Sequence, residues 1–126
     1  MKTIIRTKNA PAPIGPYNQA VLCGNTLYTS GQIAINPESG KLVLDDIKKE
    51  TTQVMNNLEA VLEAADMNFD DVIKSSIFIS NMDDFNVIND VYGSYFDDDN
   101  APARETVQVA RLPKNVNVEI SVIAEK

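Results

Sequence analysis

Arg104 stands two residues after a proline, at the start of a short segment in which polar and apolar residues alternate. This alternation is typical of a β-strand, whose successive side chains point to opposite faces of a sheet. Arg104 and Thr106 would therefore point one way and Val107 the other. A guanidinium on the polar face of a strand can bind a carboxylate or phosphate through two parallel hydrogen bonds. The alternative is an exposed arginine beside a loop.

Glu119 lies between apolar neighbours near the end of the chain, in the sequence Val118-Glu119-Ile120. A carboxyl group that is partly removed from water on a buried strand has a raised pKa, which suits it to proton transfer. Arg104 and Glu119 are therefore the candidate catalytic pair. The alternative is a structural salt bridge between these same two residues.

Two further segments contain candidate binding residues. Tyr17 belongs to a proline-rich stretch, residues 9–19, which predicts an ordered loop. Its ring can form the wall of a pocket and its hydroxyl can orient a ligand, or it can simply pack. Ser30 and Gly31 end a predicted strand, where a small residue lets backbone amides approach a ligand closely. A plain β-bulge would have the same pattern.

The composition limits the possible chemistry. The 126 residues are enough for one domain. The absence of histidine excludes Ser-His-Asp and Cys-His catalysis, and the single Cys23 leaves no structural zinc site. Cys23 is expected to be a small buried hydrophobic residue. A net charge of −7, from 11 basic and 18 acidic residues, disfavours nucleic-acid binding. No apolar run is long enough to span a membrane, and the first residues lack the pattern of a secretory signal. We therefore expect a cytoplasmic protein with no membrane partner.

The periodicity of apolar residues predicts an α+β domain. Apolar residues three and four apart predict two amphipathic helices, and alternating segments predict strands. The helices start near Ile47 and Phe85; the strands cover Val21–Cys23, Thr26–Ile33, Val72–Ser80, Ala103–Val109 and Val116–Ala124. This order is typical of a mixed sheet of about six strands with two helices on one face.

The uncovered face of that sheet must meet water or another subunit, and we expect it to be a subunit interface. Val118 and Ile120 belong to an apolar row that suits packing under the helices. Glu119 would therefore point to the uncovered face. We expect Arg104 and Thr106 on that same face, because Val107 would then face the core.

Four short motifs occur in order along the chain. They are Ile14–Tyr17 with Gln19-Ala20, Thr29–Gln32, Pro102–Arg104 with Ala110–Lys114, and Val118–Ile120. Together they resemble the signature of the RidA family (reactive intermediate deaminase, also called YjgF). The resemblance runs from about Lys8 to Ala124, so that residues 1–126 would form a single domain.

The resemblance implies a chorismate-mutase-like fold in which the strand after the first helix lies between the last two strands. It implies a homotrimer with sites between neighbouring subunits. It further implies an enamine/imine deaminase without metal or cofactor, which converts small 2-imino acids of the 2-aminoacrylate and 2-iminobutyrate type into 2-oxo acids and ammonia.

The resemblance also implies a role for each candidate residue. Arg104 holds the substrate carboxylate, Glu119 positions and deprotonates water, and Tyr17 shapes the pocket. The other substrate-binding residues are Ser30, Gly31, Asn89 on the second helix, and Thr106 where some relatives carry cysteine. Glu105 should point away from Arg104 by alternation.

Two other functions are compatible with this resemblance. A non-enzymatic trimer could bind a 2-oxo acid or amino acid in the same Arg104 pocket and regulate a partner. Endoribonuclease or translation-inhibitor activity is a third possibility, which the negative net charge and the missing histidine disfavour.

Overall fold

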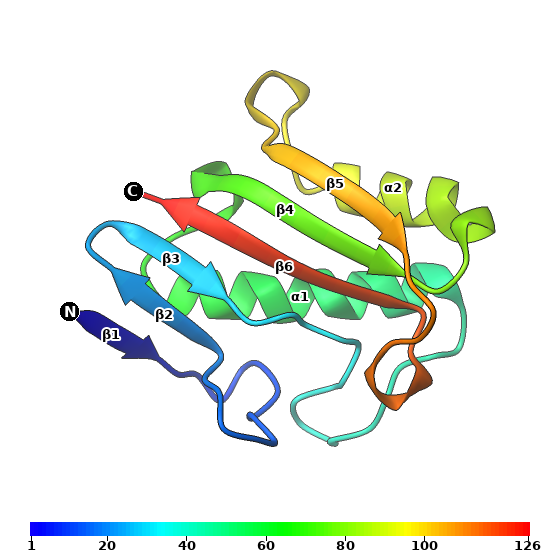
Figure 1. Ribbon diagram of the computed structural model, residues 1–126, viewed down its shortest axis with the longest axis horizontal. Helices are drawn as coiled ribbons and strands as arrows, with labels where there is room; N and C mark the ends of the chain where they lie inside the picture. The colour runs from blue at the N-terminus through cyan, green and yellow to red at the C-terminus, as the bar shows by residue number, and fades with distance from the viewer.

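Six β-strands form one mixed sheet, and two α-helices lie on one of its faces (Figure 1). The computed structural model describes all residues, 1–126. The strands are β1 (Lys2–Ile5), β2 (Ala20–Cys23), β3 (Thr26–Thr29), β4 (Val72–Ile79), β5 (Ala103–Gln108) and β6 (Val118–Glu125). The helices are α1 (Ile47–Ala64) and α2 (Phe85–Gly93). This arrangement confirms the predicted α+β class.

The strands are ordered β1-β2-β3-β6-β4-β5 across the sheet. β4 therefore lies between β5 and β6, as the resemblance implied, and the last two strands of the chain do not form a hairpin. β4 and β5 are parallel, whereas every other neighbouring pair is antiparallel. A parallel pair needs a crossover connection, and α2 supplies it.

α1 begins at Ile47, as predicted, and the residues that flank it explain both of its ends. The side chain of Asp46 accepts a hydrogen bond from the Lys49 backbone N–H at 2.7 Å, which caps the first turn. The helix stops before Asp66, whose left-handed backbone (φ 58°) cannot continue it. Between these ends Val54 and Leu58 are fully buried against the sheet. Each such side chain contributes about 1.5–3 kcal/mol through removal from water.

The two faces of the sheet differ in what covers them. Leu27 of β3 and Ile120 of β6 are fully buried on the helix side. Tyr28 points the opposite way by alternation and remains 48% exposed, and Val107 of β5 is 41% exposed. In Figure 1 no element lies in front of the sheet. One face is therefore uncovered within the chain, as predicted.

The extents of the elements and the burial of Cys23 differ in part from the sequence prediction. β6 begins at Val118 rather than at the predicted Val116. β1 was not located, because four residues at the edge of a sheet carry too short a pattern. The strand predicted to reach Ile33 stops at Thr29, although Gln32 and Ile120 exchange two backbone hydrogen bonds beyond the break. Cys23 is exposed rather than buried, since it ends β2 at the β2–β3 turn.

Candidate functional site

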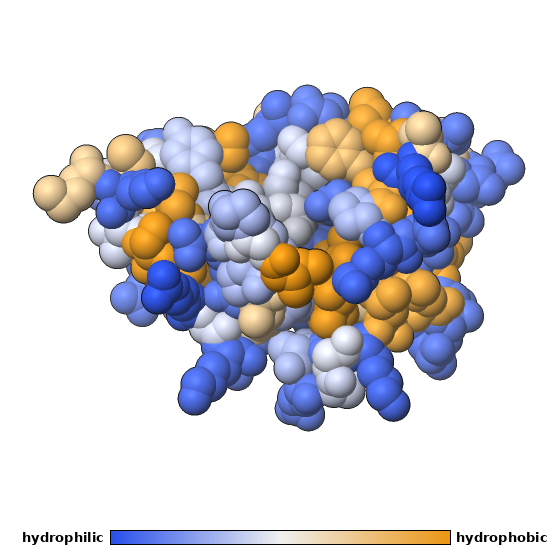
Figure 2. All heavy atoms as spheres, turned by 60° about the horizontal axis from the view of Figure 1, so that its bottom comes forward, coloured by the Kyte–Doolittle hydropathy of each residue, from blue (hydrophilic) through white to orange (hydrophobic).

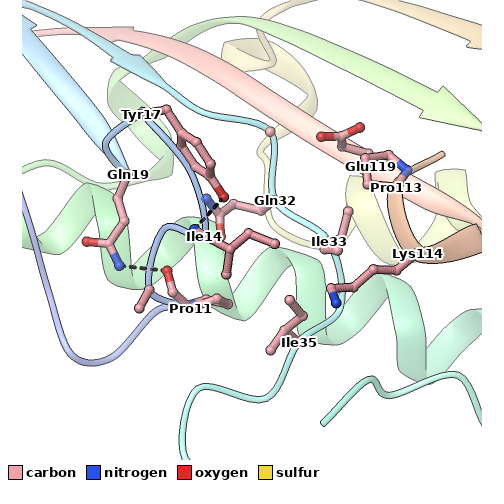
Figure 3. A pocket seen from close by; sticks show the side chains of 12 residues that line it. Pro11, Ile14, Tyr17, Gln19, Gln32, Ile33, Ile35, Pro113, Lys114 and Glu119 are labelled. Atoms are coloured by element: carbon pink, nitrogen blue, oxygen red, sulfur yellow. Dashed lines mark hydrogen bonds between the residues drawn. The ribbon is translucent and has the colours of Figure 1, made fainter. Parts of the chain in front are cut away.

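Three loops enclose a hollow of about 100 Å³ beside β6 (Figure 3). The first connects β1 to β2, the second connects β3 to α1, and the third connects β5 to β6. Figure 2 shows the side of the molecule on which these loops lie, where apolar side chains gather among charged ones. We call the enclosed space the Glu119 hollow, and it is lined by Pro11, Ala12, Ile14, Tyr17, Gln19, Gly31, Gln32, Ile33, Ile35, Pro113, Lys114 and Glu119. Three of the predicted site residues, Tyr17, Gly31 and Glu119, therefore lie together.

Glu119 projects from β6 on the uncovered face of the sheet. Its neighbours Val118 and Ile120 are fully buried on the helix side, which fixes this direction. Partial burial raises the pKa of the Glu119 carboxyl, because removal from water disfavours the charged form. No salt bridge links it to Arg104 within the chain. The salt-bridge alternative therefore does not apply to a single subunit.

Gly31 leaves space that the Glu119 carboxyl occupies. A β-carbon at position 31 would lie 2.8 Å from the Glu119 Cδ atom and would collide with the carboxylate oxygen. Real β-carbons do not approach other atoms so closely, so any other residue at position 31 would force the flexible Glu119 side chain to move from its place. Gly31 follows the end of β3, where we predicted that a small residue would permit close approach to the site.

The loop that carries Tyr17 is held by a buried glutamine. Gln19 is 3% exposed, and its Oε1 atom accepts a hydrogen bond from the Thr7 N–H at 2.7 Å. Its Nε2 atom donates to the carbonyl oxygens of Ala10 and Pro11 at 3.2 and 2.9 Å. The base of the loop is thus fixed, whereas Tyr17 itself is 48% exposed. The only sequence signal for this role is the presence of Gln19 in a motif.

Ser30 does not line the hollow with its side chain. Its hydroxyl donates to the Asn18 carbonyl at 2.5 Å, and its backbone N–H donates to the Gln19 carbonyl at 2.9 Å. Ser30 therefore ties the end of β3 to the Tyr17 loop. Of the predicted Ser30–Gly31 pair, only Gly31 faces the hollow.

Two buried polar residues of α1 hold the other loops. The Nδ2 atom of Asn57 donates to the carbonyls of Ile33 and Ile35, both at 3.0 Å. The Oε2 atom of Glu50 accepts hydrogen bonds from the backbone N–H groups of Asn117 and Val118 at 2.7 and 3.2 Å. Neither Asn57 nor Glu50 was predicted to hold a loop, although a polar side chain on the apolar side of a helix is a signal for such a role.

Arg104 points to the helix side of the sheet, so its predicted direction was wrong. Its guanidinium donates to the Asn89 Oδ1 atom of α2 at 2.5 Å. The Cζ atom lies 5.4 Å from the ring centre of Tyr92 and 5.7 Å from that of Phe85. Val107, expected in the core, is on the uncovered face. The error arises because β5 is an edge strand that the helices cover incompletely, so its apolar residues do not mark the core side.

The residues beside Arg104 alternate as predicted. Glu105 points away from it, bonding the Ser76 hydroxyl at 2.7 Å and the Lys74 ammonium at 3.2 Å. The Ser76 hydrogen bond, followed by that of Lys74, lowers the pKa of Glu105. The Thr106 hydroxyl is buried without a hydrogen-bond partner. Such a group costs free energy unless something else satisfies it.

The candidate residues thus form two separate groups. Tyr17, Gly31 and Glu119 lie in the Glu119 hollow on one side of the sheet. Asn89, Arg104 and Thr106, which we call the Arg104 cluster, lie on the side that faces α2. One chain does not bring the two groups together, because Arg104 and Glu119 project from opposite faces of strands separated by β4.

Neither group contains a constellation of metal ligands. No three side chains of the His, Cys, Asp or Glu type lie close enough together to hold a metal ion. Neither helix has the length and apolar character required to cross a membrane.

A six-stranded mixed sheet of this strand order, with two helices on one face and a partly buried glutamate in a loop-lined hollow, defines the α+β class of this domain. The sequence profile of the family described as Endoribonuclease L-PSP matches residues 7–126. The chain belongs to this family, also called the RidA/YjgF/RutC family, as its motifs indicated.

Individual relatives are similar over nearly their whole length. A RutC family protein of Pyrococcus horikoshii is 50% identical over 126 residues, covering 100% of this chain and 99% of that protein. A protein of Escherichia coli named 2-iminobutanoate/2-iminopropanoate deaminase is 44% identical over 126 residues, covering 98% of each. The crystal structure of E. coli TdcF with bound serine has a TM-score of 0.92 and 42% identity, covering 98% of both chains.

Proposed function

We propose that this protein hydrolyses small 2-imino acids to 2-oxo acids and ammonia. The observation that carries the proposal is Glu119, a partly buried carboxyl with a raised pKa that no cation of its own chain neutralises. A group of this kind can accept a proton from water near neutral pH. A deaminase name for a relative at 44% identity supports the same reaction.

In the proposed reaction the Glu119 carboxylate takes a proton from a water molecule as the water oxygen bonds to the imine carbon. The C=N double bond becomes a single bond, and its electron pair stays on nitrogen. Glu119 then returns the proton to that nitrogen, which gives a carbinolamine. Glu119 next removes the proton of the new hydroxyl group and delivers it to the nitrogen as the C=O double bond forms and the C–N bond breaks, so that ammonia leaves. The products are one 2-oxo acid and one ammonia per imine and water consumed. These reaction steps require no cofactor or metal.

We propose that the site is completed between chains of a homotrimer. Arg104 is supported from the side by Asn89 and two aromatic rings, which leaves its guanidinium in a fixed position for a carboxylate. Thr106 offers an unpaired hydroxyl two residues further along the same face of β5. The substrate carboxylate would bind to the Arg104 cluster of one chain while its imine carbon lies beside Glu119 of the next.

The test is ammonia or 2-oxo acid release from freshly generated 2-iminobutyrate or 2-iminopropionate. Purified protein at micromolar concentration should accelerate hydrolysis above the buffer background, and EDTA should leave the rate unchanged. An unchanged background rate, with the protein shown to be folded, would refute the deaminase proposal.

A second candidate function is ligand binding without turnover, which the serine bound to TdcF favours. Calorimetric binding of serine or 2-oxobutyrate by a protein that does not hydrolyse imines would support it. A parallel incubation with single-stranded RNA covers the ribonuclease activity in the family description. The proposal includes a cytoplasmic location, since the exposed thiol of Cys23 persists in a reducing compartment.

A further inference from the structure

Glu50 is a fully buried acidic residue that forms no salt bridge. It lies in the first turn of α1, which passes behind β6 in Figure 1. The one salt bridge of the chain joins Lys74 to Glu105, on the uncovered face of the sheet. A buried carboxyl group is costly unless hydrogen bonds satisfy it. The partners of Glu50 therefore indicate why this residue lies in the core.

The Glu50 carboxyl accepts three hydrogen bonds, all from the residues at which β6 starts. Its Oε2 atom accepts from the backbone N–H groups of Asn117 and Val118 at 2.7 and 3.2 Å, and its Oε1 atom accepts from the Asn117 side chain at 2.8 Å. Asn117 Oδ1 accepts from the Ser80 hydroxyl at 3.1 Å, and the Ser80 N–H donates to the Asn117 carbonyl at 3.0 Å. Glu50 thus joins α1, the start of β6 and the end of β4.

The position of the Glu119 carboxyl depends on this junction, because Glu119 is the second residue of β6. On the β3 side the support is sparse. β3 ends at Thr29, and beyond it only two backbone hydrogen bonds, between Gln32 and Ile120, continue the pairing with β6. The carboxyl fits beside Gly31 only because that residue has no β-carbon. A small displacement at the start of β6 would therefore move it out of this space.

We infer that Glu50 is a positioning residue for Glu119: its three hydrogen bonds fix the start of β6 and so hold the Glu119 carboxyl beside Gly31, partly removed from water. The inference rests on the proposed function and adds to it a residue that contacts no substrate. Glu50 is not among the residues that line the Glu119 hollow, so it acts only through the backbone and side chain that it binds.

The titration of the Glu119 carboxyl, followed by carbon-13 NMR in the full-length protein, tests this inference without requiring turnover. Glu119→Gln identifies its resonance. Burial raises the pKa of Glu119 above 4.5 in the wild type, and Glu50→Ala should lower that pKa toward 4.5, because the released side chain gains water. Tyr17 and Lys114, the other titratable residues of the hollow, are the same in both proteins. An unchanged titration in folded Glu50→Ala would overturn the inference.

Two control variants separate positioning from a general loss of stability. Glu50→Gln keeps a carbonyl oxygen for the two backbone N–H groups, and the Asn117 amide can turn to accept from the new NH2 group, so the Glu119 titration should stay as in the wild type. Val61→Ala truncates a fully buried side chain about three turns further along α1. It should lower the urea midpoint and leave the titration unchanged. A shift in either control equal to that in Glu50→Ala would overturn the inference.

Asn117→Ala keeps the test decisive if Glu50→Ala does not fold. It removes one of the three hydrogen bonds that Glu50 accepts, at a half-buried residue, and leaves the two backbone bonds in place. The pKa of Glu119 should fall in the same direction by a smaller amount. A wild-type titration in this variant would overturn the inference.

Turnover then distinguishes failure of the inference from failure of the proposed function. With 2-iminobutyrate at pH 7, Glu50→Ala should lower kcat by about 10- to 100-fold, as expected for a misplaced catalytic group, and change KM by less than about twofold. Glu50→Gln should retain the kcat of the wild type. A raised KM with an unchanged kcat would overturn the inference while leaving the deaminase intact. A wild type that hydrolyses no imine would refute the deaminase, and the titration would still decide the role of Glu50.

Discussion

The pKa of Glu119 links the proposed chemistry to pH. The general base must be deprotonated, and burial raises its pKa above the ordinary value of 4.5. We therefore expect kcat/KM to fall about tenfold per pH unit below that raised pKa, beginning at a higher pH than for an exposed glutamate. Glu119→Gln should remove nearly all turnover while keeping 2-oxo acid binding. A rate that stays level down to pH 4 would contradict this role.

The same shift has a consequence for stability, with its sign fixed by linkage. A carboxyl whose folded pKa is raised stabilises the fold below its unfolded pKa, and this contribution is lost as pH rises through the folded pKa. Glu119→Gln should therefore raise the urea midpoint at pH 7 and have little effect at pH 4 or below. A lower midpoint at pH 7 would show that the ionised carboxylate has an unseen stabilising partner.

Arg104 is expected to act through its geometry rather than through its charge alone. Lysine cannot form two parallel hydrogen bonds with a carboxylate, so Arg104→Lys should behave almost like Arg104→Ala. We expect each to cost on the order of 2–4 kcal/mol in the transition state, or roughly 30- to 1,000-fold in kcat/KM. Steady-state kinetics with 2-iminobutyrate measures this. Near-normal activity of the lysine variant would mean that only charge matters.

Adding a single methyl group at Gly31 tests whether the position of the Glu119 carboxyl matters for activity. Gly31→Ala would push the Glu119 carboxyl out of its place, because the new β-carbon would collide with it. We expect a loss of activity of at least tenfold with the fold retained. Gly93→Ala is the matched control, since nothing lies within 4 Å of its β-carbon. Because Gly93 is the last residue of α2, that change should alter the free energy of unfolding by less than about 0.5 kcal/mol, as measured by urea unfolding.

At the scale of elements, the positions of the loops depend on α1 as well as on the sheet. Asn57→Ala would remove the side-chain donor from the Ile33 and Ile35 carbonyls, although the Ile33 carbonyl still accepts from the Ile35 N–H at 2.8 Å. We expect the change to lower the free energy of unfolding by about 1–3 kcal/mol. The exposed neighbour Asn56→Ala should cost less than about 0.5 kcal/mol. Equal effects of the two variants would contradict the anchoring role of Asn57.

The elements that could be predicted from sequence are those in which the pattern of apolar residues shows which side is buried. α1 and β6 have long apolar patterns with one side in the core, so their type and facing direction were predictable, although β6 begins at Val118 rather than at the predicted Val116. β5 could be recognised as a strand, but not its orientation. Val107 lies on a face left open by the chain, and apolar residues there give no information about the helix side. The pattern of apolar residues thus predicts which way a strand faces only where the strand has a neighbour on both sides and helices cover one of its faces.

The site was predictable in its members but not in its assembly. Tyr17, Gly31 and Glu119 come from three segments that only the folded sheet brings together. All three residues belong to the motifs found in the sequence. Gln19 and Asn57, which hold those segments, interact through backbone carbonyls far away in sequence. No local pattern encodes such contacts, because any buried polar side chain can satisfy any nearby backbone group.

At the scale of the whole molecule, the separation of Arg104 from Glu119 predicts a site shared between subunits. The uncovered sheet face, where Tyr28 and Val107 are partly exposed, offers apolar surface for such an assembly. Size-exclusion chromatography with light scattering should report a trimer of the 13.9 kDa chain. A monomer at micromolar concentration would remove the basis of the shared site.

Given a trimer, Arg104→Ala and Glu119→Gln variants can be unfolded together and refolded as equal mixtures. Each parent should be nearly inactive. In a cyclic assembly each site takes Arg104 from one chain and Glu119 from the next, so both residues are intact in about one site in four under random mixing. Activity should therefore return to about a quarter of that of the wild type. If the mixture stays as inactive as its parents despite confirmed subunit exchange, Arg104 and Glu119 do not act together across an interface, and the proposed substrate geometry is wrong.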